Sequence, residues 1–382
     1  QQVKTGGYGA EFGRSTGGVI NLVTKRGSNE FQAGANVFYT PNSLEGDRPD
    51  VYLNNGTLLS DNSNDEASDE LTTAIWASGA LIQDRLFAYA LVQYGDTDNS
   101  TFFGSRTGTP QNTTQSSESP NWLVKLDWNI SDNHLVELTG MSDSRDFETD
   151  YYRSTGANRT ERGAYLGTEY DERGGDTAIL RYTGYLTDNF TLSALYGHGE
   201  ASRSNYSVTA GGLRNEYFGQ VGSPVSGCPV IVDARPSVVA GTNAPISGCS
   251  LASVIGTSLA NDERDSARID GEWALGDHLV RFGYEWDEFR SFDAESYSGA
   301  AVWRYGRYAG REDIVRKRVF QSGAGVGVDS QAFYIEDNWQ LTDNFKLYGG
   351  LRWDSFENLN GDGETFVKID NQIAPRLGFS WD

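Results

Sequence analysis

Seven charged side chains stand at alternate positions in segments whose other positions are mostly apolar. The clearest segment runs from Ala267 to Leu275, and similar alternation occurs near residues 279–290 and 345–356. Alternate side chains of a β-strand share one face, so each segment predicts a strand with an apolar face and a charged face. The charged faces suit contact with water or with another polar part of the protein. The seven residues are Arg181, Arg268, Asp270, Glu272, Arg281, Glu285 and Arg352.

The remaining reactive side chains predict neither catalysis nor a bound metal or cofactor. His134, His198 and His278 are scattered along the chain, two of them at expected turns. No Ser-His-Asp arrangement is recognisable, and the cysteines lack the Cys-x-x-Cys spacing of redox enzymes. The acidic stretch 61–70 does not match the spacing of a calcium loop, so we expect it to be solvated. The sequence therefore indicates a protein that is not an enzyme.

Five short turns position the alternating segments. Each contains an aspartate, a residue that tolerates left-handed backbone and bonds to its own main chain. The flanking segments alternate for about ten residues, against about five or six in an ordinary strand. The unequal turn spacing excludes a fixed-period repeat protein. We expect about twelve strands, near residues 29–40, 71–82, 86–96, 120–130, 134–144, 174–186, 190–203, 264–275, 279–290, 329–341, 345–356 and 373–382.

Long polar stretches alternate with the short turns, and this asymmetry is typical of transmembrane β-barrels. Tryptophans fall near both ends of the expected strands, as in the aromatic girdles of such barrels. In the alternative fold, a large soluble β-sandwich, they would belong to the core. We therefore predict an all-β fold, a transmembrane antiparallel β-barrel over residues 29–382. Its expected extracellular loops lie near 41–70, 97–119, 145–172, 204–263 and 291–328.

Composition agrees with a membrane barrel and excludes other classes. The formal net charge of −22 makes a nucleic-acid partner improbable. No run of 18 apolar residues is present, so no helical membrane span is expected. Cys228 and Cys249 lie in the longest expected loop, where thiols oxidise and disulfides persist. We expect them to pair, which would restrict the unfolded chain by roughly 3 kcal/mol in the loop-closure model.

Residues 1–28 form a separate glycine-rich segment. Residues 8–14 (YGAEFGR) and 16–27 (TGGVINLVTKRG) resemble the end of the plug domain of TonB-dependent outer-membrane receptors, particularly the Oar-like group. Residues 351–354 (LRWD) and 371–379 (NQIAPRLGF) also resemble the barrel of that group. Between these segments only the rhythm of the hairpins matches. The residues of the plug motif are Gly13, Arg14, Gly17, Gly18 and Asn21.

The resemblance implies a plug, ending near residue 28, inside a barrel of 22 strands, of which about twelve are present. It implies a protein of the bacterial outer membrane, in contact with its lipid. It also implies uptake of a ligand, coupled to the inner membrane through TonB. No TonB box is recognisable, and we expect the chain to be part of a longer protein. A peptide or protein cargo is suggested only by the Oar-like resemblance.

Two other functions stay open at this point. A passive porin has no plug, and a surface adhesion or structural protein could keep the receptor fold without transport. The charged residues on the inner faces are expected to pair with one another as scaffold more often than to contact a ligand.

Overall fold

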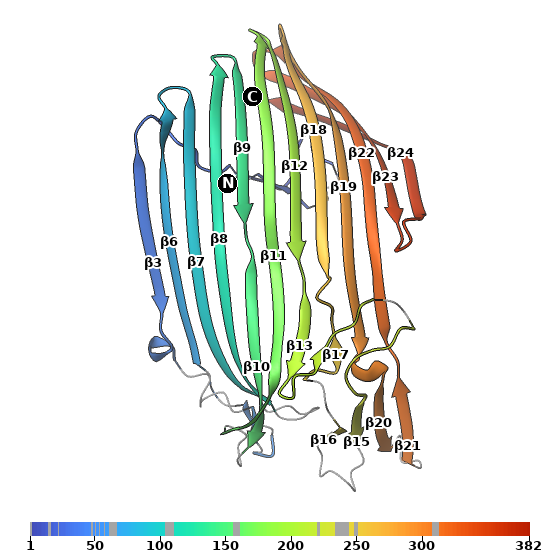
Figure 1. Cartoon of the computed structure of the whole chain (residues 1–382). Coiled ribbons are helices and arrows are strands. Elements are labelled where there is room, and N and C mark those ends of the chain that lie inside the picture. The colour runs from blue at the N-terminus through green and yellow to red at the C-terminus, as the bar shows by residue number, and fades with distance from the viewer. Residues whose placement is uncertain are drawn as a thin grey trace.

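The computed structural model is dominated by one large curved sheet, whose short turns lie at one end (Figure 1). Among the described residues, no helix is long and apolar enough to cross a membrane. Two short 3-10 helices, η1 (Asn42–Leu44) and η2 (Ser298–Ala300), interrupt the connections. The structure describes residues 2–13, 17–21, 23–46, 49, 51–52, 54–56, 58–60, 67–103, 111–155, 161–219, 222–233, 244–247, 251–307 and 313–382.

Within the described residues, a continuous path of twelve strands runs across the sheet in the order β24-β23-β22-β19-β18-β12-β11-β10-β8-β7-β6-β3. Strand β9 pairs with β8 and β11, so β9 and β10 together occupy one place in this path. All pairings in the path are antiparallel. The strands are β3 (Gln32–Thr40), β6 (Ala67–Ile82), β7 (Leu86–Phe103), β8 (Gln111–Ser131), β9 (His134–Ser142), β10 (Arg145–Thr155), β11 (Glu161–Thr187), β12 (Phe190–Ser202), β18 (Asn261–Leu275), β19 (His278–Tyr297), β22 (Gln321–Thr342), β23 (Phe345–Leu359) and β24 (Thr365–Trp381).

The prediction of an all-β fold with about twelve long strands is confirmed, and the five short turns lie where the sequence placed them. The strands are longer than predicted at the opposite end. β7 continues to Phe103, and β10 and β11 occupy most of the stretch 145–172 that was expected to be a loop. These extensions carry polar residues on both faces, so they lack the alternation from which strands can be recognised.

The two faces of the sheet differ in the way that the alternation predicted. Ile269 and Phe333 on the apolar face are 52% and 51% exposed, whereas Glu336 and Arg352 on the charged face are 3% and 1% exposed. Large apolar side chains therefore lie outward, and charged side chains are covered. This is the reverse of a soluble protein, and it matches a barrel wall whose outer face contacts lipid.

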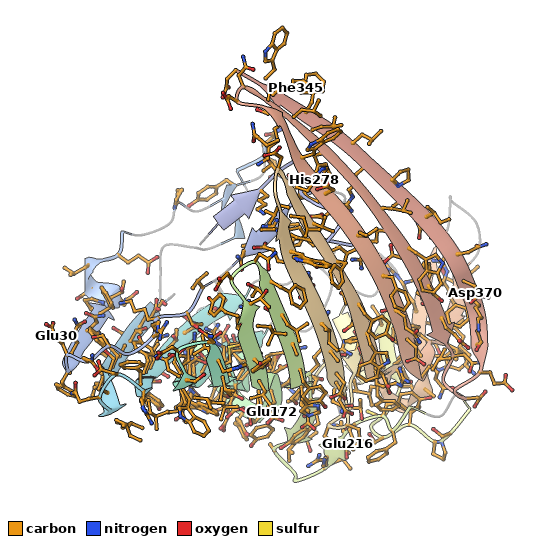
Figure 2. All side chains as sticks on the ribbon, turned by 90° about the horizontal axis from the view of Figure 1, so that it is seen from above. Glu30, Glu172, Glu216, His278, Phe345 and Asp370 are labelled. Atoms are coloured by element: carbon orange, nitrogen blue, oxygen red, sulfur yellow. The ribbon has the colours of Figure 1, made fainter. Side chains whose placement is uncertain are left out.

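An N-terminal segment, residues 2–13, lies on the concave side of the sheet, as seen from above in Figure 2. Its first strand β1 (Gln2–Lys4) pairs with β2 (Val19–Asn21). The edge strands β3 and β24 do not pair with each other within the described residues. The concave face thus has a polar segment against it.

The end of the sheet opposite the short turns carries smaller strands. β13 (Asn205–Thr209), β14 (Arg214–Asn215) and β17 (Val254–Ile255) extend the main sheet. β15 (Val230–Asp233) and β20 (Val302–Arg307) pair in parallel, and β16 (Ala244–Ser247) and β21 (Asp313–Arg318) flank them. β4 (Val51–Tyr52) and β5 (Leu58–Ser60) form a separate pair. Two stretches expected as loops, 204–263 and 291–328, therefore fold against each other.

We call the connection between β12 and β18 the lobe (residues 204–260). Its described residues have a small core of their own. Tyr217 and Ile255 are buried there against Ala294 of β19. Glu216 accepts hydrogen bonds from Arg214 at 3.0 Å and from Ser258 at 2.8 Å. Burial raises the pKa of Glu216, but these hydrogen bonds outweigh burial and leave the pKa below its ordinary value.

Candidate functional site

The charged residues on the inner face of β18 to β24 form one cluster because strand register places them in three adjacent rows. Residues directly opposite one another on neighbouring strands share a face. We call the group the inner cluster. Its rows across β18, β19, β22, β23 and β24 are Arg268, Glu285, Ala332, Asp354 and Gln372; then Asp270, Gly283, Tyr334, Arg352 and Ala374; then Glu272, Arg281, Glu336, Gly350 and Arg376.

Ion pairs connect neighbouring members of the inner cluster. Arg352 is fully buried and contacts Glu285 at 3.0 Å and Asp354 at 2.9 Å. Arg268 donates to Asp270 at 2.7 Å, and the Tyr334 hydroxyl donates to the same carboxylate at 2.5 Å.

The charged residues of the third row are also paired with one another. Arg281 pairs with Glu272 at 2.6 Å and lies 3.7 Å from Glu336. Arg281 and Glu272 are partly exposed, so this pair contributes less than the contacts of the buried Arg352 and Glu336, whose charges would be left uncompensated if a partner were removed.

Three arginines of the inner cluster bind the N-terminal segment through its backbone carbonyls. Arg376 donates to the carbonyl oxygens of Tyr8 at 3.1 Å, of Gly9, and of Phe12 at 2.6 Å. Arg352 donates to the carbonyl oxygens of Ala10 and Glu11, each at 3.4 Å. Arg268 also donates to the carbonyl of Glu11, at 3.3 Å. Five residues of backbone are thus held against the wall of the sheet.

The backbone amide of Ala10 completes this attachment. It donates to the Glu336 carboxylate at 2.6 Å and to the Tyr348 hydroxyl at 2.7 Å, while Ala10 itself is fully buried. Two glycines allow the close approach. A Cβ at Gly9 would overlap the Glu336 carboxylate, and a Cβ at Gly13 would overlap the Arg352 guanidinium. A side chain at either position would therefore displace the Glu336 carboxylate or the Arg352 guanidinium from the place where it holds the segment.

Arg181, the seventh predicted residue, lies apart from the inner cluster. Its nearest acidic partner is Glu137 at 4.0 Å, and its side chain is 52% exposed. Glu137 pairs more closely with Lys125, at 2.9 Å, which also contacts the buried Asp127 at 3.4 Å. Arg181 thus pairs with the wall of the sheet, whereas Arg268 and Arg352 also bind the N-terminal segment.

The five predicted plug-motif residues differ in their surroundings, and four of them lie among the described residues. Gly13 contacts the inner cluster, whereas Gly18 and Asn21 belong to the β1–β2 pair, where a Cβ on Gly18 would overlap the carbonyl oxygen of Lys4. Gly17 has no neighbour within 4 Å of an added Cβ. Arg14 lies outside the described residues.

The chain crosses the inner face again just before β3. A Cβ at Gly27 would overlap backbone atoms of Gly79 and Ala88, and Arg26 lies over the Phe87 ring at 5.7 Å. Residues before β2 (8–13) and after it (26–27) are therefore in contact with the main sheet.

Cys228 is disulfide-bonded in the structure. Its carbonyl accepts a hydrogen bond from Ser298 at 2.9 Å, which links the lobe to η2. The other predicted cysteine, Cys249, lies outside the described residues, so the pairing of these two cysteines stays a prediction.

Sequence reasoning missed three residues that hold the segment: Glu336, Tyr348 and Arg376. Arg376 stands between Pro375 and Leu377, so the same alternation could have identified it, whereas Glu336 is followed by another charged residue, Asp337, which obscures the alternation. Tyr348 could not have been identified in this way, because a tyrosine at an inner position resembles any other aromatic residue of a barrel strand. The contacts themselves join residues more than 320 positions apart, such as Ala10 and Glu336.

Comparison with known proteins agrees with the fold. A family model described as an outer membrane beta barrel domain matches residues 82–372. The TonB-dependent transporter Oar of Myxococcus xanthus is 24% identical over 98% of this chain and 41% of its own length. The chain thus spans about two fifths of that relative.

Two solved structures share the fold. The outer membrane transporter YddB of Escherichia coli matches 100% of this chain and 45% of its own, with a TM-score of 0.56 and 14% identity. The siderophore receptor PiuA of Acinetobacter baumannii matches 99% of this chain and 50% of its own, with a TM-score of 0.50 and 11% identity. At these identities the likeness concerns the fold alone.

Proposed function

Because the chain belongs to the outer membrane β-barrel domain family, and so lies in the bacterial outer membrane, we propose that it forms part of a TonB-dependent transporter. In this proposal residues 1–28 are the end of a plug, and the plug closes the barrel until energy from the inner membrane, delivered through TonB, rearranges it. The protein moves a ligand and catalyses no reaction. Uptake of peptide or protein is the cargo class that the Oar relative suggests.

The observation that carries the proposal is the attachment of residues 8–12 to the inner cluster. The arginines contact the segment mainly through backbone carbonyls. Such bonds fix the path of the segment, and each contributes only about 1 kcal/mol net, up to about 3 kcal/mol where a charged group is buried. A small number of these bonds holds a segment in place and still lets a pulling force remove it.

A passive porin is the main alternative, and a surface adhesion or structural protein is the other. A porin needs an open bore, so a polar segment held against the inner wall favours the gated transporter. Adhesion would use the lobe and the outer ends of the strands, and it would need no release of the segment. The two alternatives therefore differ from the proposal in measurable ways.

Two measurements test the proposal. In planar bilayers, the purified protein is expected to show little steady conductance, whereas a porin would conduct in every inserted molecule. In cells, uptake of a labelled oligopeptide mixture is expected to disappear when TonB is deleted. Steady conductance, or uptake that persists without TonB, would contradict the proposal. If cells that lack this protein lose surface adhesion but take up the peptides unchanged, the adhesion alternative would be favoured.

A further inference from the structure

On the outer face of β12 and β18, the facing residue pairs change from apolar to charged from one outward-facing pair to the next. Tyr196 lies opposite Ala267, and the next outward pair is His198 opposite Asp265. The pair after that is Glu200 opposite Glu263. This boundary lies at the ends of the two strands that enclose the lobe, since β12 ends at Ser202 and β18 begins at Asn261.

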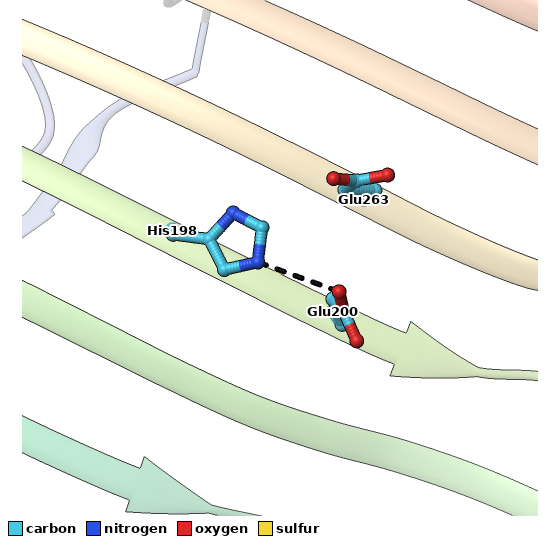
Figure 3. A group of neighbouring side chains, drawn as sticks. All are labelled: His198, Glu200 and Glu263. Atoms are coloured by element: carbon cyan, nitrogen blue, oxygen red, sulfur yellow. Dashed lines mark ion pairs between the residues drawn. The ribbon is translucent and has the colours of Figure 1, made fainter.

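From the side chains at this boundary we propose a binding site for one divalent transition-metal ion, of the Zn²⁺ type, formed by His198, Glu200 and Glu263. Figure 3 shows His198 and Glu200 on β12, with Glu263 on the neighbouring strand β18. One ligand atom from each of the three residues lies within 4.8 Å of the others. Among the described residues, no other group of three meets this condition.

The ligand chemistry favours zinc over calcium or magnesium. An imidazole nitrogen with carboxylate oxygens suits Zn²⁺ and related ions, whereas Ca²⁺ and Mg²⁺ prefer oxygen ligands alone. Zn²⁺ binds nitrogen and oxygen at about 2.0–2.2 Å in a tetrahedron, so its ligand atoms are roughly 3.4 Å apart. His198 Nε2 is already 3.5 Å from Glu200 Oε1. A carboxylate oxygen of Glu263 lies within 4.8 Å of both atoms, so a side-chain rotation would have to bring it about 1 Å closer to complete the set.

Two features outside the ligand geometry support a cation here. Glu200 and Glu263 are directly opposite each other across an antiparallel pair, and like charges in this relation destabilise a sheet. Arg290 of β19, opposite Glu263, offsets only part of this repulsion because it also pairs with Glu288 at 2.8 Å and with Asp329 at 2.6 Å, and a bound cation would reduce the rest.

Asp265 provides the second feature, because its carboxylate lies 3.0 Å from His198 Nδ1. A carboxylate on one ring nitrogen of a metal-binding histidine orients the ring and fixes the tautomer that leaves the other nitrogen free. Here the other nitrogen is Nε2, which lies 3.5 Å from Glu200 Oε1.

The consequence is structural. An ion at this position links β12 and β18 next to the base of the connection that runs from residue 203 to residue 260, where the strands are already paired up to Ser202 and Asn261. Because the three ligands come together only in the folded sheet, the bound ion stabilises the folded form. The site is independent of the plug and of transport.

Calorimetric titration of the detergent-purified, metal-free protein with ZnCl₂ tests the proposal. We expect one equivalent of Zn²⁺ to bind, with at least tenfold weaker binding in His198→Ala. His278→Ala is the matched control, since His278 also lies beside a carboxylate, Asp337, at 2.7 Å, and it should bind Zn²⁺ like the wild type. Equal binding by His198→Ala and wild type, or no binding at millimolar Zn²⁺, would overturn the site.

A second variant separates metal binding from simple surface charge. Glu263→Gln removes the like-charge pair, so without metal its unfolding midpoint should equal or exceed that of the wild type. With saturating Zn²⁺ the wild type should gain stability and Glu263→Gln should gain much less. An equal gain in both proteins would contradict the proposal, and because each protein is compared with itself, a folding defect cannot produce the expected result.

Discussion

Replacing Arg376 by methionine should detach the N-terminal segment while leaving the inner ion pairs intact. Arg376 donates three hydrogen bonds to this segment, to the carbonyls of Tyr8, Gly9 and Phe12. Arg376 is partly exposed, so a net value of about 1 kcal/mol for each bond is appropriate. The loss of about 3 kcal/mol corresponds to an increase of roughly 150-fold in the detached population.

Hydrogen exchange at the Ala10 amide reports this population directly. The amide is bonded to Glu336 and Tyr348 in the attached state, so its exchange rate should rise by roughly two orders of magnitude in Arg376→Met, as worked from the three bonds. Arg181→Met is the matched control, because Arg181 lies on the same face and pairs with Glu137 of the sheet. Unchanged exchange in Arg376→Met, or an equal rise in both variants, would refute the reasoning.

Three further predictions concern the segment and the lobe. Gly13→Val should also accelerate hydrogen exchange of the N-terminal segment, since the valine side chain would overlap Arg352. Gly17→Val should not, because the space beside Gly17 is open, and equal exchange in the two variants would argue against close packing at Gly13. Cys228→Ser should lower the free energy of unfolding of the lobe by up to roughly 3 kcal/mol, and the lobe should then be cleaved faster by protease. An unchanged rate of cleavage would show that the disulfide does not stabilise the lobe. The pKa of Glu216 lies below its ordinary value of 4.5 in the folded lobe, so its stabilising contribution is complete above that value and disappears as the pH falls through the lowered pKa. Proteolysis of the lobe should therefore accelerate at acid pH in the wild type and depend less on pH in Glu216→Gln.

The strands and short turns were predictable from sequence because both signals are local. Phe345 to Trp353 alternates cleanly, and Asp343 marks the turn before it; the structure has β23 beginning at Phe345. The strand extensions were not predictable, because outside lipid neither face has to be apolar. Residues 97–103 of β7 are of this kind, with aspartate, asparagine, serine and threonine at successive positions.

The candidate sites depend on register, which the alternation alone does not specify. Periodicity placed Arg268 and Arg352 on inner faces but could not show that both reach the carbonyl of Glu11. The absence of a metal site was expected because the histidines are scattered in sequence. His198 and Glu263 are 65 positions apart, and only the pairing of β12 with β18 brings them together.

The central claim is that the apolar face contacts lipid while the charged face holds the segment inside. Spin labels placed singly at four successive positions of β22, Phe333, Tyr334, Ile335 and Glu336, test it most directly in reconstituted vesicles. Labels at 333 and 335, where the native side chains are 51% and 53% exposed, should be accessible to lipid-soluble oxygen. Labels at 334 and 336 should be shielded from oxygen. Accessibility without this alternation, or with the opposite phase, would contradict the account.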